Sequence, residues 1–121
     1  MIFKFKRLNP NVQKRRIESE KIKEKYPERV PIICEKDPKS KIAEIDKNKF
    51  LVPSDITVSQ FSFIIRKRLK IDKASALFLL VNGKNSITGD ASLKEIYEKY
   101  KDVEDGFLYI SYTGDLMWGF K

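Results

Sequence analysis

The sequence predicts an α+β fold, and three observations support the prediction. Four short runs of apolar and aromatic residues have the length of β-strands: 29–35, 49–52, 77–81 and 107–112. Two segments, beginning near Thr57 and Ser92, combine a helix-start signal with apolar residues at helical spacing. With 121 residues, 41% of them hydrophobic and 35% charged, the chain has the size and composition of one soluble globular domain.

The composition excludes much of enzyme chemistry. The chain has no histidine to act as a general base, and its single cysteine, Cys34, has no partner for a disulfide or a cysteine zinc site. Its five glycines form no phosphate-binding loop. We therefore expect no enzyme, no cofactor and no bound metal. The first eight residues lack the long apolar core of a secretory signal, and no run can span a bilayer, so we expect a cytosolic location.

The formal charge of +8 is spread unevenly along the chain. Residues 1–73 hold 20 lysines and arginines against 10 acidic residues, whereas residues 74–121 hold 5 against 7. A basic front half is compatible with acidic peptides, anionic lipid or nucleic acid as partners, and also with a merely solvated surface. Nucleic acid is not expected, because Lys14, Arg15 and Arg16 lie on a predicted helix with few aromatic residues among them.

The first predicted element is a helix with Asn9 as its N-cap and Pro10 in its first turn. It is expected to run to about Lys25 and to stop before Tyr26-Pro27. A shorter helical turn over 3–8 is expected to precede it. The long helix must dock on the rest of the domain to be stable, because it has few apolar residues: Val12, Ile17 and Ile22.

Two strands follow. In the first, 29–35, both alternating faces are apolar, so the strand is expected inside a sheet that is covered on two sides, with Cys34 as a core residue. A polar stretch with a turn at 37–40 leads to the second strand, 49–52. Pro53 and the flanking lysines indicate that this second strand lies at an edge of the sheet.

The second half of the chain alternates helices and strands. Thr57 with Gln60 and Ser92 with Glu95 each form the capping-box pattern that begins a helix. A buried strand over 77–81 is closed by Asn82-Gly83. In the last strand, Phe107 and Tyr109 are expected on one face, with Leu108 and Ile110 on the other.

This order of elements, with one helix crossing the sheet and the last strand beside the first, is the ubiquitin-like β-grasp arrangement. We expect a four-stranded mixed sheet with the helix near Thr57 on one face and the added N-terminal helical segment on the other. The organisation expected is a helical extension over 1–27, a ubiquitin-like core over 28–113 and a flexible tail over 114–121 that contains a processing site at Gly119.

Four long segments, 26–36, 46–55, 60–68 and 105–110, closely resemble the autophagy-related ubiquitin-like modifiers, the family of GABARAP and the microtubule-associated light chains. The resemblance implies that a cysteine protease trims the chain after Gly119 and removes Phe120-Lys121. It also implies that activating and conjugating enzymes then join the new carboxyl group to phosphatidylethanolamine on the forming autophagosome. The chain is expected to be a monomer.

The resemblance further implies that cargo receptors dock through a short motif with an aromatic residue and, three residues later, an aliphatic one. By matching positions, the aromatic pocket would use Glu18, Ile22, Pro31, Ile33, Lys49, Leu51 and Phe107. The aliphatic pocket would use Phe50, Val52, Pro53, Ile56, Phe61 and Ile64. Arg29, Lys47 and Arg68 would meet acidic residues that flank the motif. Phe61 and Ile64 also fit the apolar stripe of an ordinary core helix. For these two residues we favour the core role over the pocket role by about two to one.

Three features depart from the family pattern. Phe50 stands where a tyrosine is usual, and the segment 82–90 lacks the usual paired prolines. Before the tail glycine, Trp118 replaces the more usual Phe or Tyr. An alternative function stays open: a ubiquitin-like adaptor that is never conjugated and binds peptides or microtubules through its basic N-terminal region.

Overall fold

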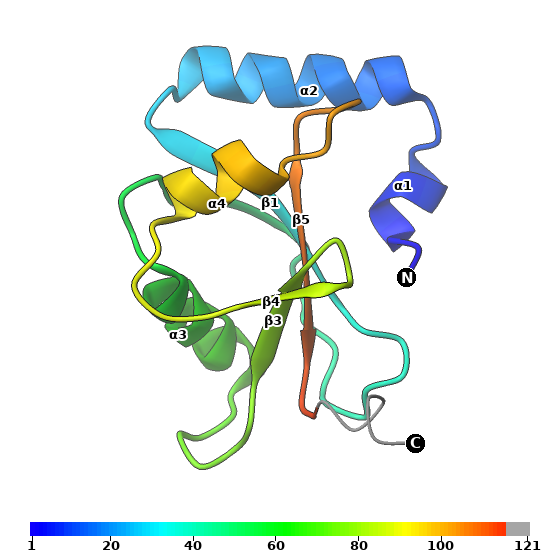
Figure 1. The fold of residues 1–121 in the computed structure, drawn as a ribbon. Helices are drawn as coiled ribbons and strands as arrows, with labels where there is room; N and C mark the ends of the chain where they lie inside the picture. The colour runs from blue at the N-terminus through cyan, green and yellow to red at the C-terminus, as the bar shows by residue number, and fades with distance from the viewer. Residues whose placement is uncertain (116–121) are drawn as a thin grey trace.

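The computed structural model describes residues 1–115. Four helices and five strands make up this part of the chain (Figure 1). The helices are α1 (Lys4–Leu8), α2 (Val12–Lys25), α3 (Val58–Leu69) and α4 (Leu93–Tyr100). The strands are β1 (Arg29–Lys36), β2 (Lys49–Pro53), β3 (Phe78–Val81), β4 (Asn85–Ile87) and β5 (Leu108–Thr113).

The strands form one mixed sheet in the order β2-β1-β5-β3-β4. β1 and β5 lie side by side and run parallel at its centre, with Ile32 opposite Leu108. β2 pairs antiparallel with β1, and β3 pairs antiparallel with β5. The predicted β-grasp arrangement, with the last strand beside the first and the second strand at an edge, is confirmed.

Each face of the sheet carries its own core, because the central strands are apolar on both sides. The larger core includes Val30, Ile32 and Cys34 of β1 and packs beneath α3 and α4. The smaller core joins Ile33, Phe107 and Tyr109 to Phe3 and Phe5 of the N-terminal segment. α2 and α1 therefore cover the face opposite α3, as predicted, and Figure 1 shows α2 lying across one end of the sheet.

Local signals explain where the helices begin. The capping boxes of Thr57 with Gln60 and of Ser92 with Glu95 are both formed, in agreement with the sequence.

Cys34 is fully buried, and burial raises the pKa of its thiol, which fits the predicted core role.

Two expectations were wrong in detail. The sheet has five strands because Asn82 and Gly83, both with positive φ, turn the chain back into the short strand β4. The N-cap of α2 is Asn11, whose side chain accepts a hydrogen bond from the Lys14 N–H; Asn9 instead follows the last residue of α1.

Candidate functional site

The outer side of β2 is a free sheet edge within the part of the chain that the structure describes. Cys34 N–H donates to Asn48 C=O at 2.7 Å, and Ser54 N–H donates to Glu28 C=O at 2.9 Å. Because bonding residues alternate along an antiparallel ladder, these two bonds place the N–H and C=O groups of Lys49 and Leu51 on the outer side. An extended chain can pair with these outward N–H and C=O groups as an added strand.

Side chains of β2 alternate between the two faces of the sheet. Phe50 and Val52 belong to the core beneath α3, and the Phe50 ring meets that of Phe61 edge-on at 5.8 Å. Lys49 pairs in register with Ile33, which belongs to the opposite core. The two sets of residues matched to the aromatic and aliphatic pockets therefore lie on opposite faces of one edge.

The aromatic-pocket residues come together between α2 and β2. Lys49 forms an ion pair with Glu18 of α2, so the two side chains bridge the gap above this face. Pro31, Ile33 and Phe107 are buried, whereas Ile22 and Leu51 remain partly accessible. Apolar side chains thus lie behind a charged pair that solvent can reach, since Lys49 is 45% exposed at its side chain.

Matching to the family pattern missed one aromatic neighbour of this pocket. Lys49 Nζ lies 5.3 Å from the ring centroid of Phe5, and that ring packs against Phe107 with centroids 5.3 Å apart. Phe5 is held there because the Glu35 carboxylate accepts hydrogen bonds from the N–H groups of Lys4 and Phe5. The presence of two phenylalanines, Phe3 and Phe5, on one short segment was the available sequence signal, since large aromatic side chains are usually buried.

The aliphatic-pocket residues divide into core and surface. Phe61 is fully buried, and Phe50 and Val52 are 5% exposed, so these three serve the core in this conformation. Ile56 and Ile64 are partly accessible, and Pro53 is exposed. Of the residues matched to the aliphatic pocket, the accessible apolar ones are therefore Pro53, Ile56 and Ile64.

The three cations expected at the rim lie around the two pockets. Arg29 donates to Leu51 C=O at 3.3 Å, and Lys47 lies 5.2 Å from the Phe50 ring centroid. Arg68 pairs with Asp46 at 3.3 Å, although both side chains are largely solvated. An acidic ligand would compete with a weak surface pair at this position.

α2 is fixed to the sheet by buried polar contacts, which the sequence did not reveal. Ile17, one of the expected docking residues, is 48% exposed, whereas Arg15 and Ser19 are the buried residues of α2. Arg15 Nε donates to the Asp105 carboxylate at 2.7 Å, and Ser19 Oγ donates to the Asp105 backbone carbonyl. The wall that α2 adds to the aromatic pocket therefore depends on Asp105.

The Asp105 carboxylate has further donors. It accepts from the Tyr109 hydroxyl at 2.5 Å and from the Phe107 N–H at 2.9 Å. Burial raises the pKa of Tyr109, and the hydrogen bond to Asp105 raises it further. Burial by itself lowers the pKa of Arg15, but the hydrogen bond to Asp105 together with the Coulombic attraction of Tyr109, Asp105 and Asp102 outweighs it, and the net pKa is raised. Arg15 and Tyr109 thus both stay protonated as donors.

The end of β5 is held by the loop that follows β1. Ser40 Oγ accepts from the Gly114 N–H at 3.1 Å, and the Tyr112 hydroxyl donates to the Ala43 carbonyl at 2.8 Å. The expected processing residue, Gly119, lies outside the described residues, as does most of the expected tail.

Residues 1–115 contain no group of His, Cys, Asp and Glu side chains arranged to hold a metal ion. Among the same residues, no helix has both the length and the apolar character needed to cross a membrane.

Comparisons with known proteins agree on one family. A family model described as "Autophagy protein Atg8 ubiquitin like" matches residues 14–119. The chain is 51% identical over 107 residues to Autophagy-related protein 8 of Schizosaccharomyces pombe, covering 88% of this chain and 87% of that protein. It is 50% identical over 116 residues to Autophagy-related protein 8 of Aspergillus niger, covering 96% of each. The crystal structure of Trypanosoma brucei ATG8 superposes with a TM-score of 0.80 at 47% identity, covering 87% of this chain and 89% of that one.

Proposed function

This chain belongs to the Atg8 family of ubiquitin-like autophagy proteins, and on that premise we propose that it is a conjugated membrane tag rather than an enzyme. A cysteine protease trims it after Gly119, and activating and conjugating enzymes attach the new carboxyl group to phosphatidylethanolamine on autophagosomal membranes. The protein is cytoplasmic before conjugation. The observation that carries this proposal is the family match, which extends to residue 119 and so includes the glycine.

Physical chemistry supports the anchoring step. A single acyl chain gives only marginal, reversible membrane binding, whereas two chains hold a protein stably. Phosphatidylethanolamine supplies two chains in one transfer. Its amine attacks the carbonyl of Gly119, which the conjugating enzyme carries as a thioester. The amide C–N bond forms, the thioester C–S bond breaks, and the enzyme thiol leaves with the proton of the amine. Glycine suits this role because it has no Cβ, so the reacting carbonyl is open from both sides.

The mass of the protein recovered from its own cells tests this function. We expect two species, one shorter by Phe120-Lys121 and one carrying in addition the mass of a diacyl phosphatidylethanolamine. Treatment with a phospholipase D should remove the phosphatidic acid part and leave ethanolamine on the chain. Recovery of only the full-length mass, under starvation as well as growth, would contradict conjugation and favour an adaptor that is never conjugated.

We also propose that the free edge of β2 docks receptor peptides as an added strand. The outward N–H and C=O groups of Lys49 and Leu51 would pair with the peptide backbone. Side chains three positions apart on an extended peptide point to opposite faces. An aromatic residue would then enter between α2 and β2, displacing the pair of Lys49 with Glu18, and an aliphatic residue would reach Ile56 and Ile64 on the other face.

Replacing Leu51 by alanine is expected to weaken this docking by about tenfold or more, because a partly accessible side chain at the centre of the contact is lost. The free energy of unfolding should fall by only about 1 kcal/mol, since part of the side chain is already solvated. Titration calorimetry with an acidic peptide that carries Trp and, three residues later, Leu measures the first quantity, and urea unfolding measures the second.

Leu77→Ala is the matched control for this experiment. Leu77 is also partly buried, but it lies just before β3, away from the β2 edge. It should reduce stability by a similar amount and leave the peptide affinity unchanged. Equal losses of affinity in the two variants would show that Leu51 acts through stability alone.

A further inference from the structure

The loop that follows β1 borders the point where the chain leaves β5 (Figure 1). We call residues 37–45 of this loop the exit loop. Its first residue continues the pairing of the two strands, since Asp37 N–H donates to Tyr112 C=O at 2.9 Å. One residue after β5, Gly114 N–H donates to Ser40 Oγ at 3.1 Å. A side chain of the exit loop therefore binds the backbone of the chain where its pairing with β1 stops.

Ser40 is held in place by the bonds of its own turn. Ser40 N–H donates to Asp37 C=O at 3.0 Å. Lys36 Nζ donates to the Ser40 carbonyl at 2.7 Å and to the Asp37 carbonyl at 3.0 Å. The Asp37 carboxylate accepts from the Lys39 N–H at 2.9 Å, a contact typical of Asx turns. Because Ser40 is also 7% exposed, its hydroxyl is a fixed acceptor inside the protein rather than a mobile surface group.

Further contacts hold the end of β5. The hydroxyl of Tyr112, a fully buried residue, donates to Ala43 C=O in the exit loop at 2.8 Å. Thr113 Oγ1 donates to Asp115 C=O at 2.9 Å and accepts from the Asp115 N–H at 3.3 Å. Side chains of the domain thus set the direction of the backbone as far as residue 115, the last one described.

The contact with Ser40 lies five positions before Gly119 in the sequence. A chain that enters an enzyme channel loses conformational freedom, and each backbone residue that must be ordered on binding weakens the affinity. A residue whose direction is already fixed by folding loses little more. The hydrogen bond to Gly114 therefore shortens the stretch of chain that an enzyme acting at Gly119 has to order.

We propose that Ser40 is a positioning residue for the reactions at Gly119, because its hydroxyl fixes the direction in which the chain leaves β5. The inference rests on the proposed conjugation, and the enzymes supply the chemistry. A purely structural role is the competing explanation, since Ile42 and Ile45 of the exit loop pack against the larger core. A structural role changes the free energy of unfolding alone, whereas a positioning role changes the KM of trimming in fully folded protein.

Ser40→Ala tests the proposal with the full-length chain and the processing protease. The KM for removal of Phe120-Lys121 should rise about five- to tenfold, the factor expected when one more backbone residue must be ordered on binding. The kcat should stay within about twofold, because the ordering is needed equally in the bound complex and in the transition state. Hydrogen exchange at the Gly114 amide should accelerate. Ser40→Thr retains the hydroxyl and should restore both the KM and the slow exchange.

Ser59→Ala is the matched control. Ser59 Oγ also joins two segments, since it donates to Gly89 C=O at 3.1 Å, but it makes none of the contacts around Gly114. It should leave the KM and the exchange at Gly114 unchanged. An unchanged or lower KM for Ser40→Ala, unchanged exchange at Gly114 in that variant, or an equal rise of KM in Ser59→Ala would overturn the positioning role alone. Failure of the protease to trim the natural chain would overturn the proposed processing and this inference together.

Discussion

Gly119→Ala is expected to abolish both removal of Phe120-Lys121 and attachment to phosphatidylethanolamine. The added methyl group lies on the carbon next to the reacting carbonyl, where it would meet the walls of a narrow enzyme channel. Losing even a few kcal/mol of transition-state contact slows a step by a factor of about a thousand. The measurement is intact mass after incubation with the processing protease, and then after reconstitution with the activating and conjugating enzymes and lipid vesicles.

Gly114→Ala provides the control for this variant. A Cβ at Gly114 would lie 3.5 Å from the side chain of Ile42, an ordinary contact, and the residue does not need a positive φ. The substitution should leave trimming, conjugation and the unfolding midpoint close to those of the natural chain. Lipidated protein obtained from Gly119→Ala would contradict the assignment of this glycine as the conjugated residue.

The general fold could be predicted because its signals are local. The capping boxes of α3 and α4 and the two-sided apolar pattern of β1 each depend on residues within a few positions of one another. β4 was missed because it has only three residues, two of them polar and exposed, and no apolar alternation marks so short a strand. Asn82-Gly83 was the one signal that indicated a hairpin there.

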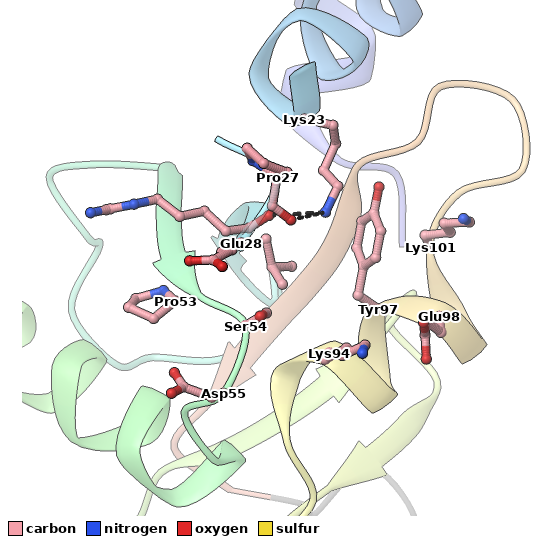
Figure 2. A pocket seen from close by; sticks show the side chains of 12 residues that line it. Lys23, Pro27, Glu28, Pro53, Ser54, Asp55, Lys94, Tyr97, Glu98 and Lys101 are labelled. Atoms are coloured by element: carbon pink, nitrogen blue, oxygen red, sulfur yellow. Dashed lines mark hydrogen bonds between the residues drawn. The ribbon is translucent and has the colours of Figure 1, made fainter. Parts of the chain in front are cut away.

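The site could be predicted only in part. Alternation along β2 and the resemblance to the family together placed side chains on the two faces of the edge. The contact of Arg15 with Asp105 joins residues 90 positions apart, and no periodicity in the sequence connects them. The lysines Lys23, Lys94 and Lys101 line one cleft together with the start of β1 and the loop after β2 (Figure 2), but they are far apart in the sequence and there resemble ordinary surface charges.

Asp105→Ala is expected to lower the free energy of unfolding by about 3–5 kcal/mol, because removing one partner of a buried ion pair leaves the other charge without compensation. Asp105 is fully buried, and Arg15 is 5% exposed. The substitution also deprives the Tyr109 hydroxyl and the Phe107 N–H of their acceptor, so three donors lose one carboxylate. Urea unfolding, monitored by far-ultraviolet circular dichroism, measures the change.

Glu104→Ala is the neighbouring control, since Glu104 is exposed and its side chain makes none of these contacts. It should change stability by less than about 0.5 kcal/mol. The double variant with Arg15→Ala should lose less than the sum of the two single losses, because the second change removes the charge that the first left unpaired. Equal effects of Asp105→Ala and Glu104→Ala would show that the buried network contributes little.

Asp105→Ala should also weaken docking of the aromatic peptide at temperatures where the variant is still folded. α2 supplies Glu18 and Ile22 to the aromatic pocket, and its two buried residues, Arg15 and Ser19, both contact Asp105. Loosening this attachment removes one wall of the pocket, whereas the aliphatic side beneath α3 keeps its own core. A peptide with alanine in place of its Trp binds through the aliphatic side and the strand edge alone, so its weaker affinity should be the same for Asp105→Ala and for the natural chain.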